Sequence, residues 1–339
     1  MIIDCHGHYT TTPRAHQEFR DAQLAWLADT SRPVPTRSLI STDEIKESIE
    51  FHQLALMHER GIDLTIFSPK ASGMEHHITD SGTAVAWAQA SNDLVAEVEA
   101  CFPRHFASVC QLPQTPNGSL ADSVVELRRC VETMGFVGCN LNPDPSGGFW
   151  TAPPLTDEFW FPLFEAMVEL DVPGMVHVSS SCNPAINTLG AHYLNADTSV
   201  FMQLLQGDLF ERFPTLRLVI PHGGGAVPYH WGRYRGLAAR MGCADPSELL
   251  RNVYFDTCVY HQLGVDLLLD VVPPANVLFA SEALGAVRGA DPDTGVAWDD
   301  TKQYVESARL TVENRHGVFE GNARRVYPRL DARLKARTG

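Results

Sequence analysis

Met1-Ile2-Ile3-Asp4-Cys5-His6-Gly7-His8 opens the chain, and this stretch indicates both a buried strand and a metal site. The apolar run at its start predicts a short strand, on which alternate side chains point to the same face. His6 and His8 therefore direct both imidazoles the same way, and Gly7 between them permits a close approach of the backbone. Histidine is the commonest metal ligand near neutral pH. Two imidazoles on one face supply half of the ligands of a divalent metal site.

Seven more apolar runs follow, with the little polar alternation expected of parallel strands that are buried on both faces. The eight predicted strands cover residues 1–5, 64–67, 106–112, 137–141, 174–178, 216–221, 253–257 and 277–280. Helical patterns lie between them, at residues 41–61, 83–100, 119–133, 160–170, 197–213, 231–241 and 262–272, with a last one at 299–319. Ser41 and Glu44 predict a capping box, and Gly61 predicts a helix end. This alternation predicts an α/β protein built as a (β/α)8 TIM barrel.

The whole chain of 339 residues fits one barrel domain, residues 1–339, because no linker divides it. Two long insertions, residues 10–42 and 282–301, are expected on the catalytic face of the barrel. The net charge of −15 argues against binding to nucleic acid or to an anionic membrane surface. The eight scattered cysteines form no CxxC motif and indicate reduced thiols in the cytoplasm. A cleaved leader is not expected, since cleavage would remove His6 and His8.

Polar residues at the carboxyl ends of the predicted strands mark the candidate active site, which is where such barrels place it. His6 and His8 end the first strand, His177 ends the fifth and Glu282 follows the eighth. Three imidazoles and one carboxylate suit zinc, with water in an open position. His222, after the sixth strand, is either a ligand of a second metal or an acid–base group. Because the fourth strand has no lysine for a bridging carbamate, we favour one metal and a catalytic His222.

These residues stand in motifs that resemble the amidohydrolase superfamily, in the branch of aminocarboxymuconate semialdehyde decarboxylase and related decarboxylases and hydratases. The motifs are DCHGHY at 4–9, VHVS at 176–179, IPHGGG at 220–225, FASE at 279–282 and EGNARRVYP at 320–328. Most of that superfamily has aspartate where this chain has Glu282. With NLNPDPSGG at 140–148 and GAHYLNADT at 190–198, this glutamate resembles the hydratases of the branch. The resemblance implies an amidohydrolase-type barrel, zinc held by His6, His8, His177 and Glu282, and a structural role for residues 320–328.

The resemblance also implies an activity. It is the addition of water to the C=C bond of 4-oxalomesaconate (2-keto-4-carboxy-3-hexenedioate), giving 4-carboxy-4-hydroxy-2-oxoadipate, in protocatechuate and gallate degradation of lignin-derived aromatics. Water activated by zinc is expected to add at C4 while an acid protonates C3. Glu282 and His222 are the acid–base candidates, and the sequence does not decide which of them accepts a proton and which donates one.

A polyanionic substrate needs local positive charge in so acidic a protein. Lys70 and Arg288 lie on predicted catalytic-face loops, although either could be an ordinary solvated charge. Tyr193 and Asn195, after the fifth strand, are candidates for hydrogen bonds to carboxylate or keto oxygens. Among partners, a small polycarboxylate substrate and a second copy of the chain in a homodimer are expected.

Two other enzyme classes compete with the hydratase on the same scaffold. A nonoxidative decarboxylase of an unsaturated or aromatic acid is the nearest, and a lactone hydrolase is the next. Fold and metal ligands do not separate these activities, because the loops set function. A barrel that uses zinc only structurally is a different class, but a structural zinc site is closed by four ligands and would not cluster at the catalytic face.

Overall fold

The computed structural model describes residues 1–78 and 80–338, and within them eight parallel strands pair in chain order. Every neighbouring pair from the first to the eighth strand is parallel. Backbone hydrogen bonds from Cys5 N to Phe279 O (2.9 Å) and from Glu282 N to His6 O (3.0 Å) join the last strand to the first. The strands are β1 (Ile3–Tyr9), β2 (Leu64–Pro69), β3 (Phe106–Gln111), β4 (Gly138–Leu141), β5 (Gly174–Val176), β6 (Leu218–Ile220), β7 (Val253–Asp256) and β8 (Val277–Leu278). The predicted (β/α)8 barrel is confirmed.

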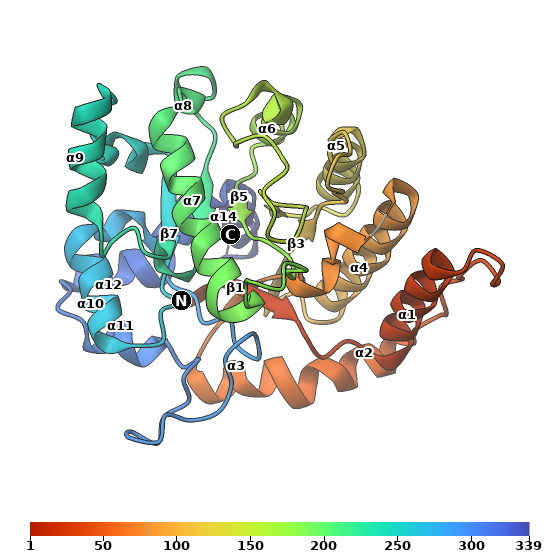
Figure 1. The fold of residues 1–339 in the computed structure, drawn as a ribbon. Helices are drawn as coiled ribbons and strands as arrows, with labels where there is room; N and C mark the ends of the chain where they lie inside the picture. Colours follow the sequence, from red (N-terminus) through yellow and green to blue (C-terminus); the bar gives the residue numbers. More distant parts are fainter. Residues whose placement is uncertain (79, 339) are drawn as a thin grey trace.

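Helices surround the strands (Figure 1). The α-helices are α1 (Arg14–Ala28), α2 (Thr42–Ile49), α3 (Ala55–Arg60), α4 (Ser81–Cys101), α5 (Ala121–Arg128), α6 (Phe161–Glu169), α7 (Tyr193–Gln206), α8 (Leu209–Arg212), α9 (Trp231–Met241), α10 (Gln262–Val271), α11 (Lys302–Ser307), α12 (Val312–His316), α13 (Asn322–Val326) and α14 (Pro328–Thr338). Short π-helical turns are η1 (Glu50–Leu54), η4 (Arg129–Thr133), η6 (Thr188–His192) and η10 (Gly317–Gly321). The 3-10 turns are η2 (Ala71–Met74), η3 (His76–Ile78), η5 (Glu158–Trp160), η7 (His222–Gly224), η8 (Pro246–Arg251) and η9 (Pro274–Asn276).

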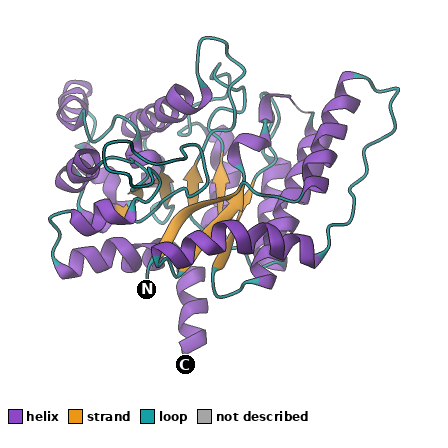
Figure 2. Cartoon of the chain, turned by 90° about the horizontal axis from the view of Figure 1, so that it is seen from below, coloured by secondary structure: helices purple, strands orange, loops and turns teal. Residues whose placement is uncertain are grey.

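The strands separate two apolar layers. One cluster fills the barrel interior with side chains such as Ile3, Ile66 and Val219, while a larger cluster lies between the strands and the helices. Tyr327 and Leu330 belong to the interior cluster, so the last two helices pack against one end of the barrel. Figure 2 shows α14 at the end opposite the arrowheads. The other end, where the strands finish, is therefore the one available for a site.

The segment at residues 320–328 ties the end of the chain to the barrel. The Asn322 amide donates to Pro274 O and Val277 O, at 2.7 Å each, and Glu320 pairs with the amino group of Met1 at 3.0 Å. These contacts hold α13 beside β8 and the start of β1. They support the structural role predicted for this segment.

Several helix predictions need correction. The single helix expected at 299–319 is broken into α11, α12 and η10, because Ala308 is extended and Thr311 starts a new helix by accepting a hydrogen bond from Asn314 N. The insertion at 10–42 contains the unpredicted helix α1. The helix predicted at 197–213 begins at Tyr193 and is followed by the separate α8. The capping box of Ser41 and Glu44 is present, and Gly61 ends α3 in the left-handed conformation.

The insertion at residues 282–301 is anchored to the helical layer. Arg60 of α3 forms a buried ion pair with Asp299 at 2.8 Å, and Asp299 accepts a hydrogen bond from Leu284 N at 3.1 Å. These contacts hold the loop that follows β8 against the barrel end. Among the helices of the described residues, none is long and apolar enough to cross a membrane.

Candidate metal centre and active site

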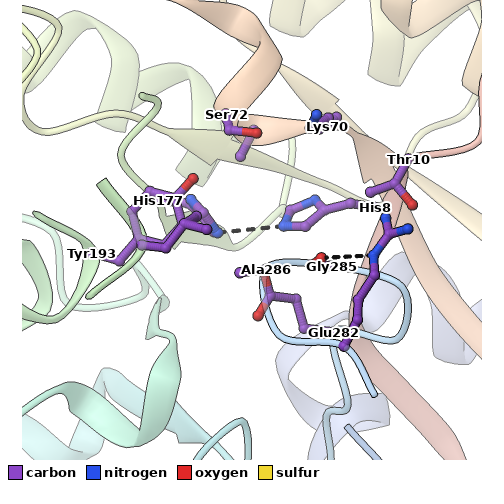
Figure 3. A pocket seen from close by; sticks show the side chains of 12 residues that line it. His8, Thr10, Lys70, Ser72, His177, Tyr193, Glu282, Gly285 and Ala286 are labelled. Atoms are coloured by element: carbon purple, nitrogen blue, oxygen red, sulfur yellow. Dashed lines mark hydrogen bonds between the residues drawn. The ribbon is translucent and has the colours of Figure 1, made fainter. Parts of the chain in front are cut away.

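Four predicted ligands meet at the carboxyl end of the barrel. One ligand atom each of His6, His8, His177 and Glu282 lies within 4.8 Å of the others, and all four residues are buried. His8 Nε2 is 3.0 Å from His6 Nε2 and 3.4 Å from His177 Nε2. Figure 3 shows His8 and His177 facing each other beside Glu282. The structure thus brings together residues from β1 and from the segments that follow β5 and β8. We call these four residues the metal cluster.

The outer nitrogen of each imidazole is held by an oxygen. The Nδ1 atoms of His6, His8 and His177 lie 2.8 Å from Asp256 Oδ2, 2.7 Å from Ser68 Oγ and 2.8 Å from Val178 O, respectively. Because the Ser68 hydroxyl donates to Pro69 O at 3.0 Å, it accepts from His8. Each ring therefore carries its proton on Nδ1 and turns the lone pair of Nε2 towards the other two rings.

Burial keeps the rings of His8 and His177 neutral. It lowers the pKa of His8 and of His177 well below the ordinary value, and neighbouring histidines lower both further. Burial alone would raise the pKa of Asp256, but its interactions with His6, His222 and the backbone of Gly223 together outweigh burial and leave that pKa below the ordinary value. The site therefore contains neutral imidazoles at His8 and His177, the form in which histidine binds metal, and an ionised carboxylate at Asp256.

The donor set fits a bound metal ion. Three lone pairs and a carboxylate face one another, so no hydrogen bond between these facing atoms satisfies them. Ligands at the usual zinc–nitrogen distance in a tetrahedron lie about 3.3 Å apart. The spacings of 3.0 Å and 3.4 Å match that geometry without a change of fold. A divalent cation would satisfy the four groups together.

Glu282 reaches the cluster through an unusual backbone. Its φ is +50°, in the left-handed region that costs a non-glycine residue about 1 kcal/mol or more. The side chain of Glu282 has room because residue 285 is a glycine: a Cβ at Gly285 would lie 2.7 Å from Glu282 Cγ. Tyr260 Oη donates to Glu282 Oε2 over 2.6 Å. Both the position and the orientation of this carboxylate are therefore specified by its surroundings.

His222 lies beside the metal cluster with one nitrogen free. Its ring centroid is 5.4 Å from that of His6 and 5.3 Å from that of His177, and it stacks on Tyr193. Nδ1 is 2.9 Å from Asp197 Oδ2, while the buried Nε2 has no hydrogen-bond partner among the described residues. Burial works against a charge on this ring, but the Asp197 carboxylate outweighs it and raises the pKa of His222 to about 9.

A cavity of about 170 Å³ opens beside the cluster and contains most of the predicted substrate contacts. Lys70, Tyr193 and Arg288 line it, together with His8, His177 and Glu282 (Figure 3). Thr10 and Ser72 also line it, although neither was predicted to bind substrate. The Arg288 guanidinium is directed by hydrogen bonds to Leu284 O (2.6 Å) and Gly285 O (3.3 Å). Asn195 is exposed on α7 and is not among the residues that line this cavity.

Sequence reasoning missed the residues that orient the ligands. Asp256 and Tyr260 lie at or just after the end of the seventh strand, and their partners His6 and Glu282 are distant in sequence. Asp197 falls inside the GAHYLNADT motif, but nothing local indicates that it pairs with His222. The available signal was position alone, since the ends of neighbouring strands must meet.

Comparison with known proteins identifies the family of the chain. The family described as Amidohydrolase matches residues 3–329. The chain is 59% identical over 338 residues to the 2-keto-4-carboxy-3-hexenedioate hydratase of a Sphingobium species, covering 99% of both chains. A crystal structure of 4-oxalomesaconate hydratase from Rhodopseudomonas palustris matches with 53% identity and a TM-score of 0.93, over 100% of this chain and 99% of that one. A dihydroxybenzoic acid decarboxylase from Polaromonas, solved with bound manganese, shares the fold at 20% identity, with a TM-score of 0.68 over 96% of each chain.

Proposed function

The chain belongs to the amidohydrolase family, and on that premise we propose that it is a metal-dependent hydratase, a hydro-lyase that acts on 4-oxalomesaconate. The product would be 4-carboxy-4-hydroxy-2-oxoadipate, an intermediate of aromatic catabolism. One observation carries the proposal. In a chain so similar to two named hydratases over its full length, Glu282 and the free Nε2 of His222 both stand at the metal cluster. Hydration of a C=C bond needs this pair, since one group must accept a proton and another must deliver one.

The metal cluster would hold one divalent ion, and its spacing favours zinc. When bound, the ion acts as a Lewis acid that lowers the pKa of a water molecule towards neutrality. Manganese in the Polaromonas decarboxylase belongs to that protein, and the donor set of three imidazoles and a carboxylate also suits other divalent metals. Metal analysis of the purified protein would identify the ion.

The hydrogen bonds of the site support separate roles for the two acid–base groups. Glu282 accepts a hydrogen bond from Tyr260 and is a member of the metal cluster, so we assign it the proton from water. His222 is paired with Asp197, which stabilises a positive imidazole and fixes Nδ1 as the nitrogen that faces Asp197. Its Nε2 would then deliver a proton to C3 while the oxygen of water bonds to C4. A return of the proton from Glu282 to His222 or solvent would restore the starting state.

Charged and hydroxyl groups of the cavity would orient the substrate. Lys70 and Arg288 offer the positive charges that its carboxylates require, and Tyr193 offers a phenol close to His177. Ser72 and Thr10 add hydroxyls on the same walls. These contacts would place the conjugated keto acid beside the metal cluster, and they would exclude uncharged alkenes.

The decisive experiment is the mass of the product formed from 4-oxalomesaconate by zinc-loaded protein. We expect the gain of one water, and we expect a chelator to stop the reaction until zinc is restored. Loss of carbon dioxide would replace the hydratase by a decarboxylase, and no reaction would contradict the proposed substrate. Metal analysis of the same preparation separates a missing metal from a wrong substrate.

A further inference from the structure

One of the two carboxylate oxygens of Glu282 accepts a side-chain hydrogen bond. Tyr260 follows β7 and Glu282 follows β8, so the two residues stand at the ends of neighbouring strands. The phenol Oη donates to Oε2 over 2.6 Å, the short distance typical of a hydroxyl bound to an ionised carboxylate. The other carboxylate oxygen of Glu282, Oε1, has no hydrogen bond with this phenol.

The backbone at both ends of this hydrogen bond is unusual. Tyr260 has φ +60° and Glu282 has φ +50°, and neither residue is a glycine or an asparagine, which tolerate this region. Such conformations persist where the surrounding structure imposes them, and they concentrate at functional sites. Two of them in the segments that follow neighbouring strands, joined by one side-chain hydrogen bond, indicate that the contact is specified by the fold.

Gly285 bounds the other side of the Glu282 side chain. A Cβ added at Gly285 would lie 2.7 Å from Glu282 Cγ and 2.8 Å from Cδ, which is closer than atoms can pack. The side chain of Glu282 therefore occupies a slot between Gly285 and the phenol of Tyr260. Glutamate needs such a slot more than aspartate does, because its longer side chain has one more torsion to fix.

We propose that Tyr260 is the positioning residue of Glu282: its phenol occupies one carboxylate oxygen, so that the other alone is presented to the metal and to the reacting water. Binding through one oxygen keeps a coordination position open and leaves the carboxylate able to accept a proton. Without the phenol, both oxygens would be free to bind the ion and close the site. The catalytic part of this inference rests on the proposed hydratase function, whereas the metal-binding part does not.

The test compares Tyr260→Phe with Tyr254→Phe in proteins loaded with cobalt(II), whose visible spectrum reports coordination number. Tyr254 is a matched control because it lies in β7 and packs in the barrel interior, and among the described residues it forms no hydrogen bond with Glu282. We expect Y260F to change the cobalt spectrum and to weaken metal binding by roughly 10- to 100-fold, as loss of outer-sphere partners usually does. We expect kcat for 4-oxalomesaconate to fall about tenfold or more with KM within about twofold. Y254F should match the wild type in all three.

The outcomes separate this inference from the proposed function. If the wild type hydrates the substrate and Y260F matches Y254F in spectrum, metal affinity and kcat, the positioning role is wrong and the function stands. If the wild type hydrates nothing but Y260F alters the cobalt spectrum, the positioning role stands and the function fails.

Gly285→Ala provides a second variant should Y260F not fold. It displaces the same carboxylate from the other wall of the slot, so it should alter the cobalt spectrum in the wild-type background. In Glu282→Gln protein, by contrast, Y260F should change metal affinity little further, because the carboxylate that the phenol orients is gone. An additive loss in that double variant would overturn the proposal.

Discussion

Two buried polar regions lie at the carboxyl end of the barrel, and they differ in how their buried polar groups are satisfied. The metal cluster consists of His6, His8, His177 and Glu282, with all four residues at most 4% exposed. A second region, which we call the Asp144 network, consists of His76, Asn142, Asp144 and Ser146, and it is buried almost as fully. Burial and polarity therefore do not distinguish the two.

The Asp144 network pairs its acceptors with donors of the protein. Asp144 accepts from the backbone of Ser146 (3.2 Å), Gly148 (2.6 Å) and Trp150 (3.1 Å), and from the Ser146 hydroxyl. Asn142 bonds to His76 Nδ1 at 2.8 Å and accepts from Asp144 N at 2.8 Å. The metal cluster instead turns three lone pairs and a carboxylate towards one another.

The contrast shows what marks a functional site in this fold. A buried polar group whose partners are all supplied by the chain is part of the structure, and removing it costs stability. A buried set of acceptors that face one another with no donor between them needs a cation from outside, and removing a member costs function. The two regions should therefore respond in opposite ways to the loss of one carboxylate.

Glu282→Gln tests the functional half of the comparison and carries the largest expected effect. Glutamine keeps the shape of the side chain but accepts no proton, so turnover of 4-oxalomesaconate should fall about a thousandfold, within the range of general acid–base catalysis. The free energy of unfolding of the metal-free protein should not fall, because the change removes a buried charge from a set of acceptors. Steady-state assays and urea unfolding measure both. Near-wild-type turnover would remove Glu282 from the mechanism.

Asp144→Ala tests the structural half. It leaves the buried backbone donors of Ser146 and Gly148 and the half-buried donor of Trp150 without their acceptor, and should lower the free energy of unfolding by about 3 kcal/mol. Asp144→Asn retains one oxygen and should lose about half as much. Turnover per folded molecule should stay within about threefold of the wild type for both, because Asp144 lies outside the cavity beside the metal cluster. Loss of turnover with stability unchanged would place Asp144 in the active site and would contradict the structural role of the Asp144 network.

The same contrast explains what could be predicted from sequence. His6, His8, His177 and Glu282 were identifiable because parallel strands must bring their carboxyl ends to one face. The hydrogen bonds of Asp256, Tyr260 and Asp197 were not identifiable, because each depends on a rotamer and on a partner in a distant segment. Asn195 shows the same limit: its place in the loop after β5 suggested a substrate contact, but α7 begins at Tyr193 and leaves it exposed.

The last and smallest prediction concerns the pH dependence of the Asp144 network. His76 donates from Nε2 to Leu112 O at 3.0 Å, and its Nδ1 accepts from Asn142. Burial lowers the pKa of His76 to about 4, helped by the positive charge of Arg20. The unfolded chain binds this proton below about pH 6.5 and the folded chain only below about pH 4, so the unfolded state binds more protons between these values. Stability contributed by neutral His76 is therefore present above pH 6.5 and is lost as the pH falls.

Between pH 7 and pH 5.5 the loss attributable to His76 should be about 1 kcal/mol. Urea unfolding at the two pH values measures the drop in the free energy of unfolding. The contribution of His76 is the difference between the drop in the wild type and the smaller drop in His76→Gln protein. His16, whose pKa burial also lowers to about 4, adds a similar loss that this variant retains. Replacing the exposed His52 by glutamine should leave the drop unchanged. If H76Q shows the full wild-type drop, His76 is not held neutral by the network, and the claim that the Asp144 network satisfies its own polar groups fails at that residue.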